Sequence, residues 1–207
     1  MSDMSFSFHF EPMAASLALG YLLGSIPFGL FFVFLSGAGD VRKIGSGNIG
    51  ATNVLRTGKK WAAAATLLCD GAKGAAAVLL TRHFMDGYEA FAAAGAVFGH
   101  MFPLWIKFKG GKGVATYLGT CFALYWPVGL LVGGTWLAAA LIWRISSLSA
   151  LIAIALSSAY FLLLHHDNYA VLALLLSALV YYMHRDNIRR LMRGEEPRIG
   201  EKSSAAR

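Results

Sequence analysis

MAASLALGYLLGSIPFGLFFVFL, residues 13–35, carries no charged side chain and decides the fold class. A helix needs about 20 consecutive apolar residues to cross the hydrocarbon core of a bilayer, and this stretch is long enough. Residues 148–164, LSALIAIALSSAYFLLL, form a second block of the same kind. Soluble cores do not supply several such blocks in one short chain, so the sequence predicts an integral membrane protein.

The composition of the whole chain indicates the same class. Of the 207 residues, 57% are apolar and 14% are charged, whereas a soluble domain carries about a quarter charged residues. A transmembrane barrel would show segments of roughly ten residues with alternating polarity, and none is visible. The net charge of +7 would suggest a nucleic-acid partner in a soluble protein, but here the basic residues lie in short loops. We expect an all-α protein that contacts membrane lipid and no nucleic acid.

Seven apolar segments are predicted to be transmembrane helices. They are Met13–Leu35, Trp61–Thr81, Glu89–Ile106, Val114–Trp126, Val128–Trp143, Leu148–Leu164 and Tyr169–Met183. The fourth and fifth meet near Pro127, so they form either one long helix or a tight hairpin. With an outside N-terminus and seven crossings, every Lys and Arg except Lys73 and Arg82 lies on the cytoplasmic side, as the positive-inside rule requires. The sequence thus predicts one domain over 1–198 and a disordered cytoplasmic tail over 199–207.

Three polar, glycine-rich segments fall on the cytoplasmic side of this topology. The first is GDVRKIGSGNIGATNVLRTG at 39–58. Its glycines let the backbone approach a ligand closely, and successive backbone N–H groups can cradle an anion. The candidate ligand-binding residues here are Arg42, Ser46, Gly47, Asn48, Thr52, Asn53 and Arg56. The alternative interpretation is a flexible loop with helix-capping residues.

The second segment, GHMFPLWIKFKGGKGVAT at 99–116, places lysines among glycines just before a helix that starts at Val114. Free N–H groups and the helix dipole favour a phosphate at such a terminus. It is not a Walker A loop, because Lys112 is followed by Gly113 rather than Ser or Thr. The candidates are His100, Lys109, Gly110, Gly111, Lys112 and Gly113. The alternative is a basic loop that touches anionic lipid head groups.

The third segment is HRDNIRRLMRGEEP at 184–197, which follows the last apolar block. His184 and Asn187 are three residues apart, so a helix would place them on one face. A histidine at the membrane surface can donate to an oxyanion or move a proton. Most of the arginines in this segment are interpreted as cytoplasmic anchors rather than ligands.

DGAKG at 70–74 puts two ionisable residues inside a predicted transmembrane helix. Such residues are costly in a bilayer and are functional candidates by default. Asp70 and Lys73 are spaced for an ion pair with each other, and contact with a substrate is equally open. Gly71 and Gly74 predict that the helix breaks here.

These segments together resemble the acyl-phosphate:glycerol-3-phosphate acyltransferase family of bacterial membranes. The resemblance rests on GSGNIGATNVLRTG at 45–58, GHMFPLWIKFKGGKGVAT at 99–116 and HRDNIRRLMRGEEP at 184–197, with GSIPFG at 24–29 and DGAKG at 70–74. It implies a seven-helix protein of the bacterial inner membrane with its active site on the cytoplasmic side. It also implies transfer of a fatty acyl group from acyl phosphate to the 1-position of sn-glycerol 3-phosphate, which yields lysophosphatidate and phosphate.

The resemblance also implies roles for individual residues. The matching catalytic positions are Ser46, Arg56, Lys112, His184 and Asn187, with Glu196 in support. The expected substrates are acyl phosphate and glycerol 3-phosphate, without a cofactor, a metal or an obligate protein partner. Phosphate is already a good leaving group in an acyl phosphate, so the enzyme mainly positions two anions and stabilises charge. We expect direct attack by the glycerol hydroxyl, with a substrate phosphate oxygen as the base that the family suggests.

A transporter for a phosphorylated solute is the alternative function. Transporters also use broken helices with glycines, but they bind substrate near the midplane with access from both sides. In the predicted topology the polar motifs lie on one face, and the outer loops are short. These features favour the enzyme.

Overall fold

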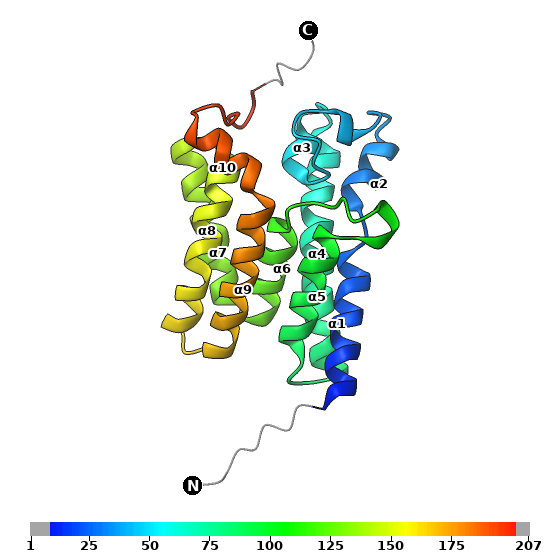
Figure 1. Ribbon diagram of the computed structural model, residues 1–207, viewed down its shortest axis with the longest axis vertical. Coiled ribbons are helices and arrows are strands. Elements are labelled where there is room, and N and C mark those ends of the chain that lie inside the picture. The colour runs from blue at the N-terminus through cyan, green and yellow to red at the C-terminus, as the bar shows by residue number, and fades with distance from the viewer. Residues whose placement is uncertain (1–8, 202–207) are drawn as a thin grey trace.

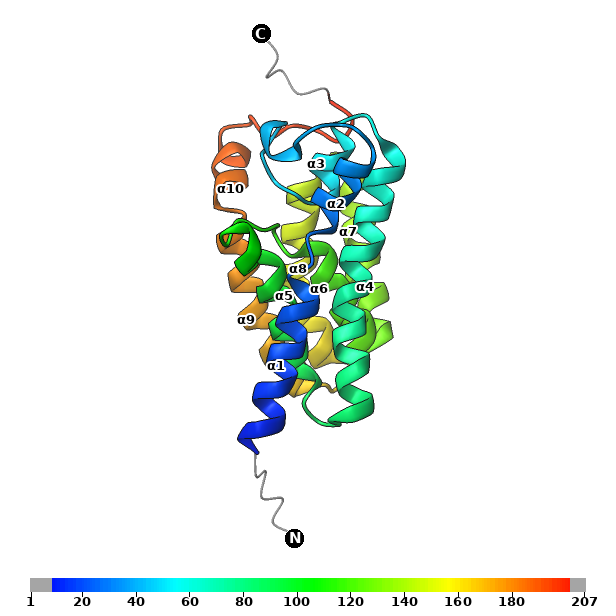
Figure 2. The same cartoon turned by 90° about the vertical axis from the view of Figure 1, so that its right-hand side faces the viewer.

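The computed structural model describes residues 9–201, and every regular element in that range is a helix. The long helices run side by side along the long axis of the molecule (Figure 1 and Figure 2). Their bounds are α1 Phe10–Gly24, α2 Phe28–Leu35, α3 Ala51–Leu55, α4 Lys60–Phe84, α5 Glu89–Met101, α6 Val114–Leu124, α7 Trp126–Trp143, α8 Ser146–Leu163, α9 Asp167–Met183 and α10 Arg185–Met192. Two short 3-10 helices, η1 Val41–Lys43 and η2 Leu104–Ile106, lie in the loops.

Five stretches of the chain are long and apolar enough to span a membrane. They are Phe10–Leu35, Lys60–Phe84, Glu89–Ile106, Trp126–Trp143 and Ser146–Leu163, and Val114–Leu124 and Asp167–Met183 are shorter apolar helices. Large apolar side chains such as Phe34, Leu141 and Leu163 are mostly exposed, as expected where the outer surface contacts lipid. The helical membrane class is therefore confirmed for the described residues, while the seven crossings and their orientation stay predictions.

The first apolar segment is interrupted between α1 and α2, although it was expected to run on. Ser25 closes α1 by donating its N–H to Tyr21 O at 2.9 Å. Pro27 follows and has no N–H to continue the ladder. At this break the carbonyl of Ile26 accepts the N–H of Phe28 at 3.1 Å, and Lys73 Nζ of α4 also donates to it at 2.7 Å.

The helix break expected at Gly71 and Gly74 is wrong, because α4 continues from Lys60 to Phe84 without interruption. These glycines instead allow α6 to approach closely. A side chain at Gly74 would collide with Thr116 O, and one at Gly119 would collide with Gly71 O. Small residues at a helix interface let two backbones come together in a membrane protein, which is the physical reason for the glycines here.

The fourth and fifth apolar segments form two helices rather than one. Tyr125 is extended, with φ −156° and ψ 104°, and separates α6 from α7. Pro127 then lies in the first turn of α7, where its missing N–H costs nothing. The tight hairpin is thus the correct one of the two alternatives.

Helix α6 lies between two groups of helices, as Figure 1 shows, with α1, α4 and α5 on one side and α7, α8 and α9 on the other. Tyr117 of α6 is almost fully buried, and its hydroxyl lies 2.5 Å from Ser157 Oγ of α8. At one end of the molecule, α3, α10 and the loops that flank them gather together (Figure 1). This end holds the candidate site.

The first residues of the expected tail, 199–201, are among those that the structure describes. Ile199 donates its N–H to Arg144 O at 2.6 Å. That bond ties the segment after α10 to the turn between α7 and α8. Residues 202–207 of the expected tail lie outside the described residues.

Candidate active site

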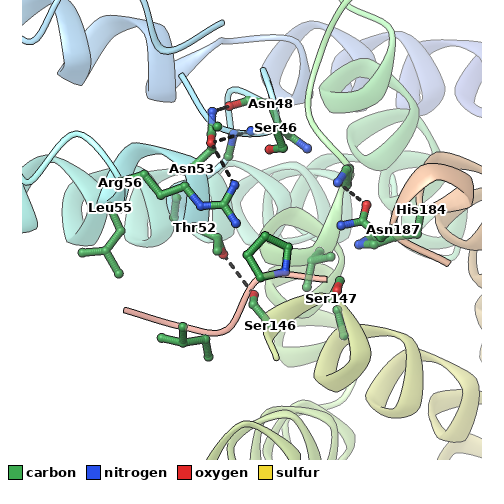
Figure 3. Close-up of a pocket in the computed structure, with 18 of the residues that line it drawn as sticks. Ser46, Asn48, Thr52, Asn53, Leu55, Arg56, Ser146, Ser147, His184 and Asn187 are labelled. Carbon is green, nitrogen blue, oxygen red and sulfur yellow. Dashed lines mark hydrogen bonds between the residues drawn. The ribbon is translucent and has the colours of Figure 1, made fainter. Parts of the chain in front are cut away.

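A cavity of about 1150 Å³ lies at the end of the molecule that holds α3 and α10. All three polar segments line it, although they are far apart in the sequence (Figure 3). The sequence-predicted residues that line it are Ser46, Asn48, Thr52, Asn53, Arg56, Asp70, His100, Lys112, Gly113, His184, Asn187 and Glu196. The cavity therefore brings all five expected catalytic residues around one space.

Asn53 organises the loop before α3. Its buried amide donates to Val41 O, Ile44 O and Asn48 O at 2.8–3.0 Å. Its side-chain oxygen accepts the backbone N–H of Ser46 at 3.2 Å. The loop thus closes around one side chain, so Asn53 supports the cavity wall rather than projecting a free ligand group.

Gly45 and Arg56 complete this loop. Gly45 has φ +53°, and a side chain there would press on Asn53 Oδ1 and Arg56. Only glycine adopts such a conformation at no cost. Arg56 ends α3, and its Nη1 lies 3.4 Å from Asn53 Oδ1. The guanidinium keeps further donors for an anion in the cavity.

Lys112 stands at the end of the glycine loop between η2 and α6. Its ammonium group donates a short hydrogen bond to Asn187 Oδ1 of α10. Gly113, with φ +84°, then turns the chain into α6. Lys112 is therefore aimed by a residue 75 positions further along the chain.

Asn187 links Lys112 to a carboxylate. Its amide donates to Glu196 Oε1 at 2.5 Å, and Ser147 Oγ donates to the same oxygen at 2.7 Å. Arg190 Nε donates to Glu196 Oε2 at 2.7 Å. Burial opposes ionisation of Glu196, but these hydrogen bonds lower its pKa. The carboxylate is thus charged, and it orients both Asn187 and Arg190.

Five basic residues line the cavity, namely Lys43, Arg56, Lys112, Arg190 and Arg198. Burial lowers the pKa of Lys112 to about 8; Glu196 opposes this shift, and the like charges of Arg190 and Arg56 add to it. Like charges lower a lysine pKa only over short distances. These cations therefore share one space, in which an anion relieves their mutual repulsion.

His184 occupies the junction of α9 and α10 and is almost fully buried. Its Nδ1 lies 2.8 Å from Val180 O. A carbonyl only accepts hydrogen bonds, so Nδ1 carries the proton and Nε2 is left as an acceptor. Burial lowers the pKa of His184 to about 4. The ring is thus neutral at pH 7, able to accept a hydrogen bond but a weak base.

The far wall of the cavity is apolar. Leu118 of α6, Val132 and Trp136 of α7, and Ile154 of α8 line it, together with Leu67 of α4. Apolar lining of this kind favours hydrocarbon over water by about 25 cal/mol for each Å² buried. The cavity thus joins a cationic end to a wall suited to an alkyl chain.

Some predicted ligand residues lie outside the lining of this cavity. They are Arg42, Gly47, Lys73, Lys109, Gly110 and Gly111, all of them described residues. Arg42 is exposed and paired with Asp40, with Nη2 2.9 Å from Oδ2. Lys73 pairs with Asp70 Oδ1 at 2.8 Å, so the ion-pair alternative is the one that the structure contains. Lys109 is exposed on the loop surface.

Sequence reasoning missed some residues that the structure brings to the cavity. Ser146 and Ser147 begin α8, and Ser146 Oγ lies 3.0 Å from Thr52 Oγ1 across the cavity (Figure 3). Arg190 was one of four arginines that could bind phosphate or act as anchors, and it was not singled out; its Nε donates to Glu196. The pair of serines at the start of an apolar block was the available signal. Arg190 is one turn after Asn187, on the same helix face.

The fold and the cavity define a class of protein: a helical membrane protein with a site for an anionic, amphipathic molecule. Among residues 9–201, no group of three or more His, Cys, Asp or Glu side chains could hold a metal ion. The donors that line the cavity are instead cations, amides and hydroxyls.

Comparison with known proteins identifies the family. The family model described as Glycerol-3-phosphate acyltransferase matches residues 14–194. Relatives of that description include one from Paramagnetospirillum magneticum, 59% identical with 93% of this chain and 96% of the relative covered. Another, from Rhodospirillum rubrum, is 51% identical with 100% of both chains covered. The chain therefore belongs to the glycerol-3-phosphate acyltransferase family, whose members are membrane acyltransferases.

Solved structures agree with this assignment. The crystal structure of PlsY (YgiH), an integral membrane glycerol 3-phosphate acyltransferase, in its glycerol 3-phosphate form matches with a TM-score of 0.86 and 36% identity, covering 91% of this chain and 96% of that chain. The lysophosphatidic acid form of PlsY matches with a TM-score of 0.82 and 34% identity, covering 91% and 95%. At this identity and coverage the likeness extends along nearly the whole chain.

Proposed function

We propose that this protein transfers a fatty acyl group from acyl phosphate to the 1-position of sn-glycerol 3-phosphate, releasing lysophosphatidate and phosphate. The observation that carries the proposal is the two-part cavity. It presents Arg56, Lys112 and Arg190 at one end and an apolar wall around Trp136 at the other. A reaction between a phosphorylated polyol and an acyl phosphate needs both parts at once.

The names of the solved relatives support the acceptor and the product. PlsY has been crystallised in a glycerol 3-phosphate form and in a lysophosphatidic acid form. In this chain, the cations of the cavity bind the phosphate groups of the two substrates. The apolar wall holds the alkyl chain of the donor, and the same wall then holds the chain of the product.

The chemistry is direct acyl transfer. The 1-hydroxyl oxygen of glycerol 3-phosphate attacks the acyl carbonyl carbon, and the bond from that carbon to the phosphate oxygen breaks. The phosphate leaves with the electron pair, and the hydroxyl proton passes to a phosphate oxygen of the substrate. Lys112 and Arg56 stabilise the negative charge that develops on the carbonyl oxygen of the acyl group and on the leaving phosphate. No step requires a covalent bond between the protein and the acyl group.

Two contacts support a route without an acyl-enzyme. Ser46 lines the cavity, but no described basic side chain hydrogen-bonds its hydroxyl. His184 is held by Val180 O, and its pKa of about 4 makes it too weak a base to activate a serine. Both residues act as hydrogen-bonding groups: His184 Nε2 accepts the hydroxyl of the acceptor, and Ser46 donates to a substrate oxygen.

We also propose the placement of the protein in the cell. The seven apolar helices cross the bacterial inner membrane, with the N-terminus outside and the cavity facing the cytoplasm. The excess of Lys and Arg at the cavity end supports this orientation. Both small substrates are then available to the site from the cytoplasm.

The test uses purified protein in lipid vesicles with labelled glycerol 3-phosphate. Palmitoyl phosphate is offered in one reaction and palmitoyl-CoA in another. The expected result is labelled lysophosphatidate with palmitoyl phosphate alone. Labelled product with palmitoyl-CoA rather than palmitoyl phosphate would contradict the assignment of acyl phosphate as the donor. Uptake of labelled glycerol 3-phosphate into the vesicles without any product would favour a transporter.

A further inference from the structure

Three charged or polar side chains lie buried beneath the glycine loop. Asp70 and Lys73 of α4 and His100 of α5 are 2%, 5% and 5% exposed. Lys73 Nζ lies 2.8 Å from Asp70 Oδ1 and donates to Ile26 O at 2.7 Å. His100 Nδ1 lies 3.6 Å from Asp70 Oδ1. Buried charges persist only when partners compensate them, so these side chains depend on one another.

His100 is the member that touches the glycine loop. Gly111 donates its N–H to His100 O at 3.0 Å, and Gly110 donates to Met101 O at 3.1 Å. A side chain at Gly111 would overlap His100 Nε2. The loop is thus hydrogen-bonded to main-chain carbonyls of α5, and the imidazole of His100 forms the floor under Gly111.

The residue after this floor contact is Lys112, which reaches across to Asn187. We infer that Asp70, Lys73 and His100 are positioning residues that fix the glycine loop and thereby aim Lys112 into the cavity. This inference rests on the proposed function only in that Lys112 must serve the reaction. A continuous series of contacts then runs from the α1–α2 break to α10, joining the two sides of the molecule.

Direct contact with substrate is the competing role for these residues. Asp70 and His100 line the cavity, whereas Lys73 does not. His100 Nδ1 has no hydrogen-bond partner among the described residues. A substrate ligand would act on its own, independently of Lys112. A positioning residue would act only while Lys112 is present, so the two roles differ in a measurable way.

The experiment is a double-mutant cycle with Asp70→Asn and Lys112→Ala, measured as kcat/KM with labelled glycerol 3-phosphate and palmitoyl phosphate. Residues that work through one another show non-additive effects. We expect Asp70→Asn to lower kcat/KM by about 10- to 100-fold in the natural chain and by less than about 3-fold beside Lys112→Ala. The cycle is repeated with Asn187→Ala in place of Lys112→Ala, in case the lysine variant is too slow to follow.

The matched control is Glu89→Gln at the start of α5, near the end of α4 that lies away from the cavity. Glu89 is also a buried carboxylate, with Oε1 3.4 Å from Arg82 Nε. Both single variants should lower the melting temperature, but only Asp70→Asn should lower kcat/KM of the folded protein. If Asp70→Asn does not fold, the pair Asp70→Asn with Lys73→Met removes both charges together, which buried sites often tolerate.

The possible results distinguish a positioning role for Asp70 from direct contact with the substrate. Equal factors for Asp70→Asn with and without Lys112 would overturn the positioning role and assign Asp70 to the substrate. Loss of activity in Glu89→Gln to the same degree would reduce the cluster to a general stabilising role. If the unsubstituted protein makes no lysophosphatidate, the proposed function is wrong. That result differs from a wrong positioning role, which would show only in the double-mutant cycle.

Discussion

Arg56 and Lys112 face the same cavity, but different parts of the chain hold them. Arg56 belongs to a loop that Asn53 closes with hydrogen bonds to residues at most 12 positions away. Lys112 takes its place from Asn187, 75 positions distant, and from a loop that rests on His100. One cation is positioned locally, and the other is positioned by the packing of separate helices.

Because the two cations are held differently, their positions should depend on different parts of the chain. The Arg56 loop should keep its shape as long as its own sequence is intact. The Lys112 loop should respond to changes in α5 and α10, which contact it directly, and in α4, which contacts His100 through Asp70. A cation held by several elements also reports whether those elements are correctly assembled, which makes Lys112 the more sensitive of the two.

The largest effect is expected for Lys112→Ala. It removes a half-buried positive charge from the cavity, so kcat/KM should fall by about 10²- to 10³-fold. Steady-state rates in vesicles measure this loss. Circular dichroism should show an unchanged helix content. A loss below about 5-fold would mean that Arg56 and Arg190 suffice, and the contrast between the two cations would disappear.

Asn53→Ala tests the locally built loop. It removes one hydrogen bond from each of the carbonyls of Val41, Ile44 and Asn48. Val41 O and Ile44 O keep a backbone donor, and each lost hydrogen bond costs about 0.5–1.5 kcal/mol. We expect a lower melting temperature and a drop in kcat/KM of roughly 100-fold as Arg56 moves. Asn48→Ala is the milder comparison, because the side chain of Asn48 accepts one hydrogen bond, from Gly50 N. Full activity in Asn53→Ala would show that the loop is held by something else.

Asn187→Ala tests the distant partner of Lys112. The ammonium group keeps its charge but loses its acceptor, so kcat/KM should fall by about 10- to 30-fold, less than for removal of the lysine. Arg189→Ala is the neighbouring control, since Arg189 is exposed and its ion pair is with Asp186. Equal activity of the Asn187 and Arg189 variants would show that Asn187 does not hold Lys112.

The pH profile sharpens the comparison further. Lys112 must be protonated to bind an anion, and its pKa of about 8 lies within reach of ordinary assays. We expect kcat/KM to fall about tenfold per pH unit above that value, because it reports ionisation in the free enzyme. Arginine stays charged throughout this range. A profile that remains flat to pH 10 would show that Lys112 is not the titrating group.

The smallest effect is expected at the apolar wall. Trp136→Ala removes aromatic surface that lines the cavity, and a buried methylene contributes about 0.8 kcal/mol. We expect kcat/KM to fall about 3- to 5-fold for long acyl donors and to change little for short ones. Acyl phosphates of graded length measure it. An equal change for every chain length would place the donor away from α7.

The sequence was informative where the signal is local. The apolar blocks predicted the helices, and Pro127 marked the point where a hairpin was one of two alternatives. Gly45 and Asn53 stood in a motif that suggested an ordered anion-binding loop. The structure contains the ordered loop, but the side chain of Asn53 bonds to the loop backbone rather than facing a ligand. The sequence could not predict this, because an amide that is free and one that is fully hydrogen-bonded look the same in sequence.

Contacts between distant segments could not be derived in this way. Gly71 and Gly74 suggested a break, since glycine lowers helix propensity, yet the approach of α6 gives them a packing role. Nothing near Ser147 in the sequence points to Glu196, with which it shares a hydrogen bond. The hydrogen-bond partners of Lys112 and Glu196 are set by how the helices pack, and that packing cannot be derived from local sequence patterns.

The lysine that supports the loop also bears on how the chain is made. The carbonyl of Ile26 lies at the break between α1 and α2, where the N–H of Phe28 and Lys73 Nζ both donate to it. Synthesis proceeds from the N-terminus, so the first hydrophobic segment emerges before Lys73 exists. A non-helical stretch of backbone is tolerated at membrane depth only where protein buries it. We therefore expect the break in the first segment to reach its final hydrogen bonding only when α4 packs against it.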